Sequence, residues 1–327
     1  MNLNRVFNLS ILMLAIFSVA GCKKNNTPTP SPSVFIAGDA GDTAIFWKNG
    51  IAEPLSNGNK TAGAFQIAVS GNDLYIAGYN GNNAGYWKNG VFNVLPVKTG
   101  TINASILSIS VSGNNVYLGG VMNVAGTSYV TLWKDGIRTD VDSTSNGSCS
   151  SIFVNGGDVY FAGETFANNT TSACYWKNGT PYPLMPNTSS MANSIFVSGT
   201  DVYVAGVYGA DQNNVAALWK NGVLTSLSST WGIANSVIVV NGDVYVGGVE
   251  DVNGHQTATI WKNGTATNLM GGIPLSIGNS VFVSGGDVYL AGLVLDGLGN
   301  QYAAYWKNGQ PFVVGVDGTA ANSIYIQ

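Results

Sequence analysis

The stretch Trp219-Lys220-Asn221-Gly222 decides the fold, because the same tetrapeptide occurs six times in the chain. A seventh copy, which begins at Trp133, has Asp in place of Asn. Successive tryptophans are 40 to 46 residues apart, at Trp47, Trp87, Trp133, Trp176, Trp219, Trp261 and Trp306. A repeat of this length with β-type residues in every copy is typical of a propeller or a solenoid.

Four short apolar segments, A to D, recur in each repeat. In one copy, A is 193–197, B is 201–206, C ends in Trp219-Lys220 and D is 223–227. They are rich in Val, Ile, Tyr and Phe and are bounded by Gly, Asn, Asp or Ser, which predicts strands. Asn-Gly favours a type I′ hairpin between C and D, because both central residues need a positive φ. We expect four antiparallel strands per repeat, stacked on the neighbouring repeats.

The two ends of the repeat region predict closure into a ring. The region opens at Val34 with a B segment and ends with an A segment, Ala321 to Gln327. A linear solenoid has no use for such a split repeat, whereas a ring uses the last strand to complete the first blade and to remove exposed edges. The predicted fold is all-β: a seven-bladed propeller over 33–327, four antiparallel strands per blade, closed by the C-terminal strand.

The first residues predict export. Arg5 precedes an apolar run, and the run ends in Val19-Ala20-Gly21-Cys22, which resembles the bacterial lipobox. The resemblance implies a signal peptide over 1–21 and lipid on Cys22, followed by a Pro- and Thr-rich tether over 22–32. The membrane is then a partner, and the location is the bacterial cell envelope, on the outer membrane or the periplasmic side. The alternative is an ordinary secretory signal with a chance cysteine.

Charge and metal-ligand content exclude several classes. Only 9% of residues are charged, against roughly 25% in an ordinary globular protein. There is no basic patch, which argues against nucleic acid as a partner. His255 is the only histidine, which excludes a His-rich zinc site, and no EF-hand-like run is present. We expect no cofactor, no metal and a monomer.

Cys149 and Cys174 fall in the A and C strands of one blade, with B between them. Two strand spacings amount to about 9–10 Å, which is beyond the roughly 7 Å that a disulfide spans between Cα atoms. We therefore expect two separate thiols.

The repeat unit resembles the bacterial extracellular repeats of the HAF type, which share an aromatic-Trp-x-Asn-Gly hairpin. It is also similar to kelch repeats, in which a strand such as Val244 to Gly248 ends in paired glycines. Most copies here end in Ala-Gly, and the kelch tryptophan is placed differently. Both resemblances imply a scaffold and no particular reaction.

Residues that recur in every repeat are interpreted first as structure. The seven tryptophans are expected to pack blade against blade. Five aspartates stand in the tight turn where segment B begins, a position at which Asp commonly caps its own backbone amides: Asp73, Asp158, Asp201, Asp243 and Asp287. The repeat lysines are expected to ring one face in water. An equivalent row of asparagines, each followed by serine, frames a channel mouth or bonds to neighbouring loops: Asn193, Asn235, Asn279 and Asn322.

Binding residues are expected in the B-to-C and D-to-A connections, which vary and emerge on one face. The candidate binding face contains Trp231, Tyr208, Asp39, Asp42, Glu164, Asp211, Glu250, Asp251 and Asp296. The acidic residues suit a sugar or a cation, but they also suit plain turn chemistry. Trp231 is the only tryptophan outside the repeat position, and it is either a stacking platform or a buried plug.

No motif in the sequence rises to catalysis: His255 has neither a Gly-x-Ser-x-Gly elbow nor a phosphate loop to accompany it. The function predicted is a non-catalytic, envelope-anchored binding or scaffold module, with a glycan or an envelope protein as partner. The alternatives are a carbohydrate-binding lipoprotein and a glycan-active enzyme. An enzyme requires two acids, or one acid with His255, near the axis.

Overall fold

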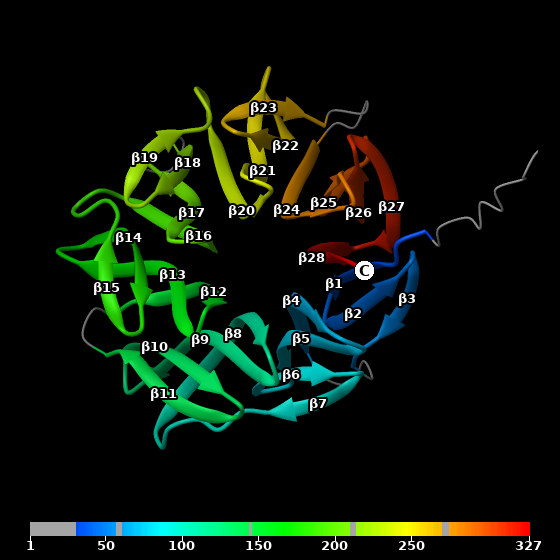
Figure 1. Cartoon of the computed structure of the whole chain (residues 1–327). Helices are drawn as coiled ribbons and strands as arrows, with labels where there is room; N and C mark the ends of the chain where they lie inside the picture. The colour runs from blue at the N-terminus through cyan, green and yellow to red at the C-terminus, as the bar shows by residue number, and fades with distance from the viewer. Residues whose placement is uncertain (1–30, 57–60, 144–145, 210–213, 270–274) are drawn as a thin grey trace, which may run out of the picture. The chain divides into compact units, whose positions relative to one another are not determined.

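The computed structural model describes residues 31–56, 61–143, 146–209, 214–269 and 275–327. The fold below is that of the unit Pro32–Gln327. Seven four-stranded antiparallel sheets form a ring around an open centre (Figure 1). Among the described residues, no helix is long and apolar enough to cross a bilayer.

Each blade has one inner strand beside the centre and a second strand outside it. The inner strands are β28 (Thr319–Ile326), β4 (Ala62–Ser70), β8 (Thr101–Ser112), β12 (Ser148–Asn155), β16 (Ser190–Ser198), β20 (Gly232–Val240) and β24 (Leu275–Ser284). The second strands are β1 (Val34–Ala40), β5 (Asp73–Asn80), β9 (Asn115–Val124), β13 (Asp158–Ala167), β17 (Asp201–Tyr208), β21 (Asp243–Val252) and β25 (Asp287–Leu295).

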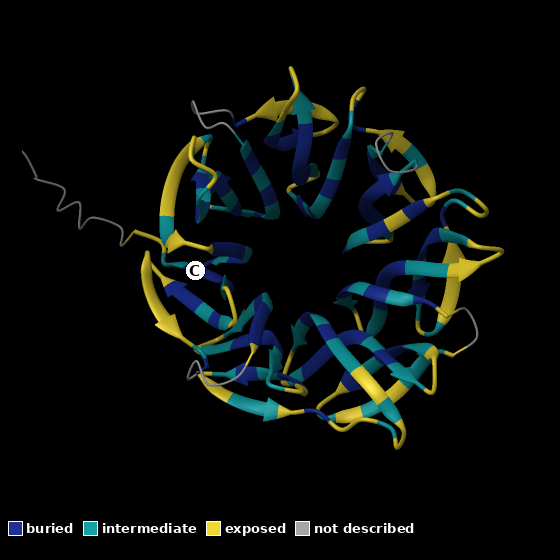
Figure 2. Ribbon diagram, turned by 180° about the vertical axis from the view of Figure 1, so that it is seen from behind, coloured by how far each residue is buried: buried dark blue, intermediate teal, exposed yellow. Residues whose placement is uncertain are grey.

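The third strand contains the repeat tryptophan, and the fourth is the outer edge of the blade. The third strands are β2 (Thr43–Lys48), β6 (Asn83–Lys88), β10 (Thr127–Lys134), β14 (Thr170–Lys177), β18 (Val215–Lys220), β22 (His255–Lys262) and β26 (Gln301–Lys307). The outer strands are β3 (Ile51–Pro54), β7 (Val91–Val94), β11 (Ile137–Asp142), β15 (Thr180–Pro183), β19 (Val223–Ser226), β23 (Thr265–Asn268) and β27 (Gln310–Asp317). Figure 2 shows exposure concentrated on these outer strands.

The predicted ring closure is confirmed. The first blade has the order β28-β1-β2-β3, so its inner strand comes from the C-terminal end of the chain. The Ser33 amide donates to the Gln327 carbonyl at 2.7 Å, and the Gln327 amide donates back to Ser33 at 3.0 Å. We number this blade 1 and the following blades 2 to 7 in chain order.

The predicted hairpins between third and fourth strands are confirmed in every blade. In blade 5, Asn221 has φ of 51° and Gly222 has φ of 81°, as a type I′ turn requires. The variant copy folds in the same way, with φ of 51° at Asp135. Asp tolerates the left-handed region better than most residues, which explains why the substitution preserves the turn.

The repeat tryptophans pack blade against blade, as predicted. Each of the seven is at most 1% exposed. Trp87 of blade 2 packs with Phe35 and Ala37 of blade 1, and Trp47 of blade 1 packs with Tyr289 of blade 7. The same contact therefore continues around the ring and across the closure.

The glycine that ends segment B lies within each second strand and is required by a bulge in the inner strand. Opposite Gly206, the register shifts between Ala192 and Ser194, so Asn193 is the extra residue. The bulge brings the Met191 carbonyl so close that a Cβ on Gly206 would lie 2.0 Å from its oxygen. The equivalent glycine in every blade meets a carbonyl oxygen within 2.1 Å. No side chain fits there.

Cys149 and Cys174 are free, buried thiols, as predicted. Both pair with Gly163, which lies on the strand between them. Burial raises the pKa of each thiol to about 12.

Candidate functional site

The ring has two unlike faces. Asp73 at the start of β5 contacts Lys88 at the end of β6, so both kinds of short hairpin emerge on the same side. We call this side the turn face. The opposite side, the loop face, contains the connections from second to third strands and from outer to inner strands.

A four-residue network repeats on the turn face. In blade 5 the Lys220 ammonium lies 2.8 Å from the Asp201 carboxylate, and Asn221 Nδ2 donates to the same carboxylate at 2.8 Å. Tyr203 lies beneath the lysine, with Nζ 5.3 Å from the ring centre. Lys220, followed by Asn221, lowers the pKa of Asp201. The same ion pair forms in blades 2, 4, 6 and 7.

This network corrects two expectations. The aspartates hold the lysine and the asparagine of the next hairpin, whereas they were expected to cap their own backbone. The backbone cap comes from the hairpin instead: the Val202 amide donates to Asn221 Oδ1 at 2.8 Å. Five of the repeat lysines are therefore paired rather than simply solvated. Blade 3 exchanges the two residue types, with Asn115 at the start of β9 and Asp135 in the hairpin. Asp135 keeps the cap by accepting the Val116 amide at 2.8 Å.

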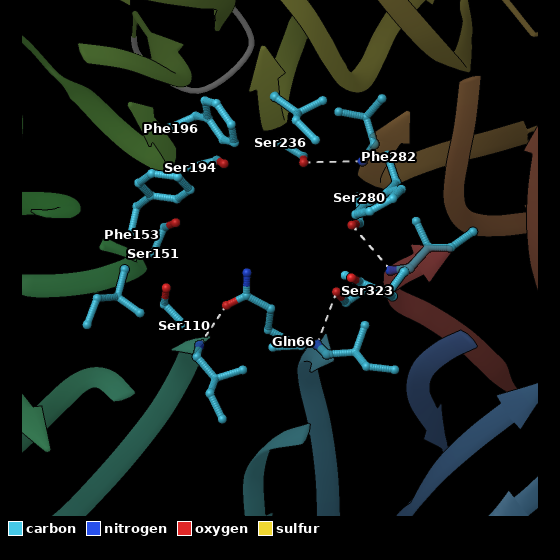
Figure 3. Close-up of a pocket in the computed structure, with 18 of the residues that line it drawn as sticks. Gln66, Ser110, Ser151, Phe153, Ser194, Phe196, Ser236, Ser280, Phe282 and Ser323 are labelled. Carbon is cyan, nitrogen blue, oxygen red and sulfur yellow. Dashed lines mark hydrogen bonds between the residues drawn. The ribbon is translucent and has the colours of Figure 1, made fainter. Parts of the chain in front are cut away.

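A ring of hydrogen bonds joins the inner strands around the central channel. In six blades a serine just after the bulge accepts the amide proton of the next blade's inner strand: Ser108, Ser151, Ser194, Ser236, Ser280 and Ser323. In blade 2 the position is Gln66, whose Oε1 accepts the Ile109 amide at 2.7 Å. Figure 3 shows Gln66 around the opening together with Ser151, Ser194, Ser236, Ser280 and Ser323.

The side-chain amide of Gln66 uses its oxygen but not its nitrogen. Its Oε1 also accepts the Ser108 hydroxyl proton. Because a backbone N–H can only donate, the acceptor must be the oxygen, which fixes the amide orientation. The nitrogen is left with no hydrogen-bond partner among the described residues, and it extends into the channel (Figure 3).

The channel has two chambers on either side of this ring. Toward the turn face, an aromatic chamber of about 260 Å³ is lined by four rings in two close pairs. Phe153 and Phe196 have centroids 4.6 Å apart, and Phe282 and Tyr325 have centroids 4.9 Å apart. In blades 2 and 3 the equivalent residues are Ala68 and Ser110. This chamber is therefore crowded on one side and open on the other.

Toward the loop face, an amide chamber of about 120 Å³ is lined by the bulge residues and the serine ring. The predicted row of asparagines lines it, and each amide bonds to the neighbouring inner strand. Asn193, Asn235 and Asn279 donate to backbone carbonyls of the next blade at 2.9–3.0 Å. In blades 2, 3 and 4 the bulge residues are Phe65, Leu107 and Ser150.

A hollow on the loop face is linked to the amide chamber by one pair of aromatic rings, although the two cavities share no lining residue. The hollow has a volume of about 310 Å³ and is lined by Tyr79, Asn82, Asn83 and Asn103. The Tyr79 and Phe65 ring centroids are 5.8 Å apart, so this pair connects the hollow to the chamber. Gly63 makes room for the tyrosine, because a Cβ there would lie 2.7 Å from the Tyr79 ring.

Three predicted carboxylates are buried or half-buried between strands. Asn322 Nδ2 donates to Asp39 at 2.7 Å, and the Ser148 hydroxyl donates to Glu164. Glu250 is 9% exposed. Burial raises the pKa of all three. They belong to blades 1, 4 and 6, and the structure does not bring them together.

Two other predicted acids accept hydrogen bonds from backbone amides of the turns in which they lie. Asp251 accepts the Gly254 amide at 2.9 Å. Asp296 accepts the Leu298 and Asn300 amides at 2.8 and 3.0 Å, and Asn300 holds its pKa below the usual range. Asp42 is an exposed turn residue whose carbonyl accepts the Ala62 amide at 2.9 Å. Asp211 and Cys22 lie outside the described residues. Within those residues, no group of three acidic, His or Cys side chains is placed to hold a metal.

Trp231 and Tyr208 are half-buried on the loop face. The Trp231 carbonyl accepts the Asp251 amide at 2.7 Å, and the Gly232 amide donates to Asn214 at 2.9 Å. Backbone hydrogen bonds therefore hold this connection to the loop before β18 in blade 5 and to β21 in blade 6. The Tyr208 hydroxyl lies 2.8 Å from Ser226 Oγ. Trp231 is thus intermediate between an open platform and a buried plug.

Three residues of the candidate site, Gln66, Phe65 and Tyr79, were missed in the sequence. Gln66 replaces a serine that recurs in the six other repeats, and that departure was the available signal. Tyr79 and Phe65 had no such signal, because their contact depends on the bulge.

Comparisons with known proteins identify the architecture alone. No protein-family model matches the chain, and no curated protein matches it. Among solved structures, acylaminoacyl peptidase of Pyrococcus horikoshii is similar with a TM-score of 0.51 and 12% identity, over 86% of this chain and 50% of that one. The chain thus spans half the length of that peptidase. A nidogen/laminin complex aligns with a TM-score of 0.45 and 10% identity, over 72% and 92% of the two chains. Likeness at these identities concerns the fold.

Proposed function

We propose that this protein is a non-catalytic binding module of a bacterial cell envelope, held at the membrane by lipid on Cys22. The observation that carries the binding part is the amide chamber with the hollow linked to it. Both are lined by amides, hydroxyls and aromatic rings that the ring scaffold holds in place. Concave sites with a few fixed polar groups are the usual form of ligand sites.

The distribution of acids supports a role without catalysis. Acid–base chemistry requires a proton donor or acceptor within hydrogen-bond reach of the reacting group, and usually a second group opposite it. Asp39 and Glu164 lie in blades 1 and 4, and each has a hydrogen-bond donor of its own. His255 is exposed at the start of β22, away from the residues that line the amide chamber.

The anchoring part is tested by changing one residue. Cys22→Ala in the full chain should move the protein from the membrane fraction to the soluble fraction or block its processing, because one acylated thiol supplies the anchor. Normal signal cleavage with full membrane retention contradicts the anchor.

The binding part is tested by affinity capture. The full chain, purified in detergent, is presented to envelope proteins and to a glycan array. We expect retention of one class of ligand that survives washing and is competed by that ligand in free form. If neither screen gives such a ligand, the binding function is wrong.

A further inference from the structure

We infer that the amide chamber and the hollow linked to it form a site for a neutral glycan, with the terminal sugar in the chamber and Gln66 donating to that sugar. The inference rests on the proposed binding function and specifies its ligand and site. It follows from four properties of the described residues: free donors, free acceptors, an aromatic wall and the absence of cationic side chains.

The free donor is the Gln66 amide nitrogen. A serine at this position would supply the acceptor that the next blade needs and one short hydroxyl donor close to the strand, as Ser108 does when it donates to Gln66. The longer glutamine supplies the same acceptor to Ile109 at 2.7 Å and adds an NH₂ group directed at the channel. Hydroxyl and ring oxygens of a sugar accept such donors.

The free acceptors are the asparagine side-chain oxygens. Asn193, Asn235 and Asn279 each donate Nδ2 to a carbonyl of the next blade. Asn322 does the same to Ala64, at 2.9 Å. The four Oδ1 atoms accept no hydrogen bond from the described residues, so successive blades 5, 6, 7 and 1 present an arc of carbonyl oxygens. Sugar hydroxyls are donors as well as acceptors and fit such an arc.

The aromatic wall lies on blade 2, beside the end of that arc, where Asn322 bonds to Ala64. Phe65 lines the chamber, Tyr79 lines the hollow, and their rings are in contact. A pyranose has C–H bonds on its face and hydroxyls on its edge, so an aromatic ring flanked by amides is complementary to it. The hollow continues the surface with Asn82, Asn83 and Asn103, which suits a second sugar unit.

The charge of the site selects the class of glycan. The residues that line the chamber and the hollow include no Lys, Arg or His. The Asp39 carboxylate contacts the lining through its hydrogen bond with Asn322. An anionic sugar would be desolvated there without a counter-charge, which is costly. A neutral glycan meets no such penalty.

An extended peptide fits the site less well. It would need unpaired backbone groups along a strand edge. The inner strands pair with the second strands on one side, and their bulge carbonyls already accept the asparagine amides. The free groups are side-chain amides around a closed ring, which favours a compact, many-hydroxyl ligand.

The test uses the full chain in detergent and titrates it with linear neutral gluco-, manno-, xylo- and chito-oligosaccharides. Oligogalacturonate serves as the anionic counterpart. We expect at least one neutral series to bind and the anionic series not to bind. Gln66→Ser restores the serine of the other repeats and should preserve the fold. It should weaken binding about tenfold, the effect of one lost hydrogen bond.

Two further variants make the result decisive. Tyr79→Ala should weaken binding about tenfold or more with little change in melting temperature. Tyr182→Ala is the matched control, because Tyr182 is an exposed aromatic, 41% accessible, on the outer strand of blade 4. It should leave affinity unchanged.

Other outcomes overturn the inference in distinguishable ways. Neutral glycans that bind equally to the Gln66→Ser and Tyr79→Ala proteins overturn the site but leave the binding function in place. Capture of a peptide or an envelope protein, with no glycan binding, overturns the ligand class. An absence of any captured ligand overturns the inference together with the proposed function.

Discussion

The turn face and the loop face of the ring are built from the same repeat but use it differently. On the turn face, five blades repeat one network of Lys, Asp, Asn and Tyr, and the ion-pair distance is 2.8 Å in each. On the loop side, equivalent positions differ: the bulge residue is Asn in four blades and Phe, Leu or Ser in the others.

The difference separates stability from recognition. A network that is identical in five blades offers the same surface five times, so it suits the scaffold. Departures such as Gln66 and Phe65 are confined to one sector of the ring, and a single ligand can read them. Changes in the scaffold should therefore alter unfolding, whereas changes in this sector should alter binding.

The largest effect should follow removal of Ala321–Gln327. The deletion takes most of β28 from blade 1 and exposes the edge of β1, including buried Ile36 and Phe35. We expect aggregation or a large fall in melting temperature. An unchanged melting curve with monomeric elution would mean that β28 does not close the ring.

The second effect compares two tryptophans. Trp261 is fully buried in the contact between blades 5 and 6, and Trp261→Ala should cost about 3–5 kcal/mol of unfolding free energy. Trp231 is half-buried on the loop face, so Trp231→Ala should cost about 1–2 kcal/mol. Urea denaturation measures both. Equal costs would show that Trp231 is a plug; if the Trp231 variant also loses a ligand, it is part of the binding face.

The third effect is a pH dependence of the unfolding free energy. Its sign is opposite for Asp201 on the turn face and for Asp39 on the loop side. Lys220 lowers the pKa of Asp201, so this group stabilises the fold above the ordinary carboxyl range and less so as pH falls through its folded pKa. Burial raises the pKa of Asp39, so its contribution declines as pH rises from the ordinary carboxyl pKa through the folded one.

The corresponding variants isolate these two slopes. Between about pH 3 and pH 7, Asp201→Asn should reduce the gain of stability with rising pH, whereas Asp39→Asn should increase it. Both changes should be small, since Asp201 is exposed and screened and Asp39 is half-buried. Slopes of the same sign in urea titrations would contradict the assignment of opposite environments.

The smallest effect concerns the two buried cysteines, which we expect not to react with thiol reagents in the folded protein. Cys149 and Cys174 lie in the interior of blade 4, and burial raises the pKa of each to about 12. In the native protein at about pH 8, neither should react with a thiol reagent, because the thiolate is the nucleophile. Both should react in urea. Rapid labelling without denaturant would reveal local opening of this blade.

Local patterns were enough to predict the architecture. Asn221-Gly222 specifies its own turn, and the split between Val34 and Ala321 implies closure, so both could be predicted from neighbouring residues. The prediction that Asp201 caps its own backbone was wrong, because the partners of its carboxylate, Lys220 and Asn221, come from the following hairpin. The site residues are harder still. Gln66, Phe65 and Tyr79 acquire their roles from a bulge and from the next blade, and neither is encoded within their own segment.

The seam between Ser33 and Gln327 has a consequence for how the chain can be rearranged. Two backbone hydrogen bonds hold these residues together within blade 1, so a short peptide link between them would strain little. New ends could then be cut in the exposed Asn178-Gly179 hairpin of blade 4, because nicks at exposed loop tips are well tolerated. Such a circular permutant would keep all seven sheets while moving its free ends to another sector of the ring.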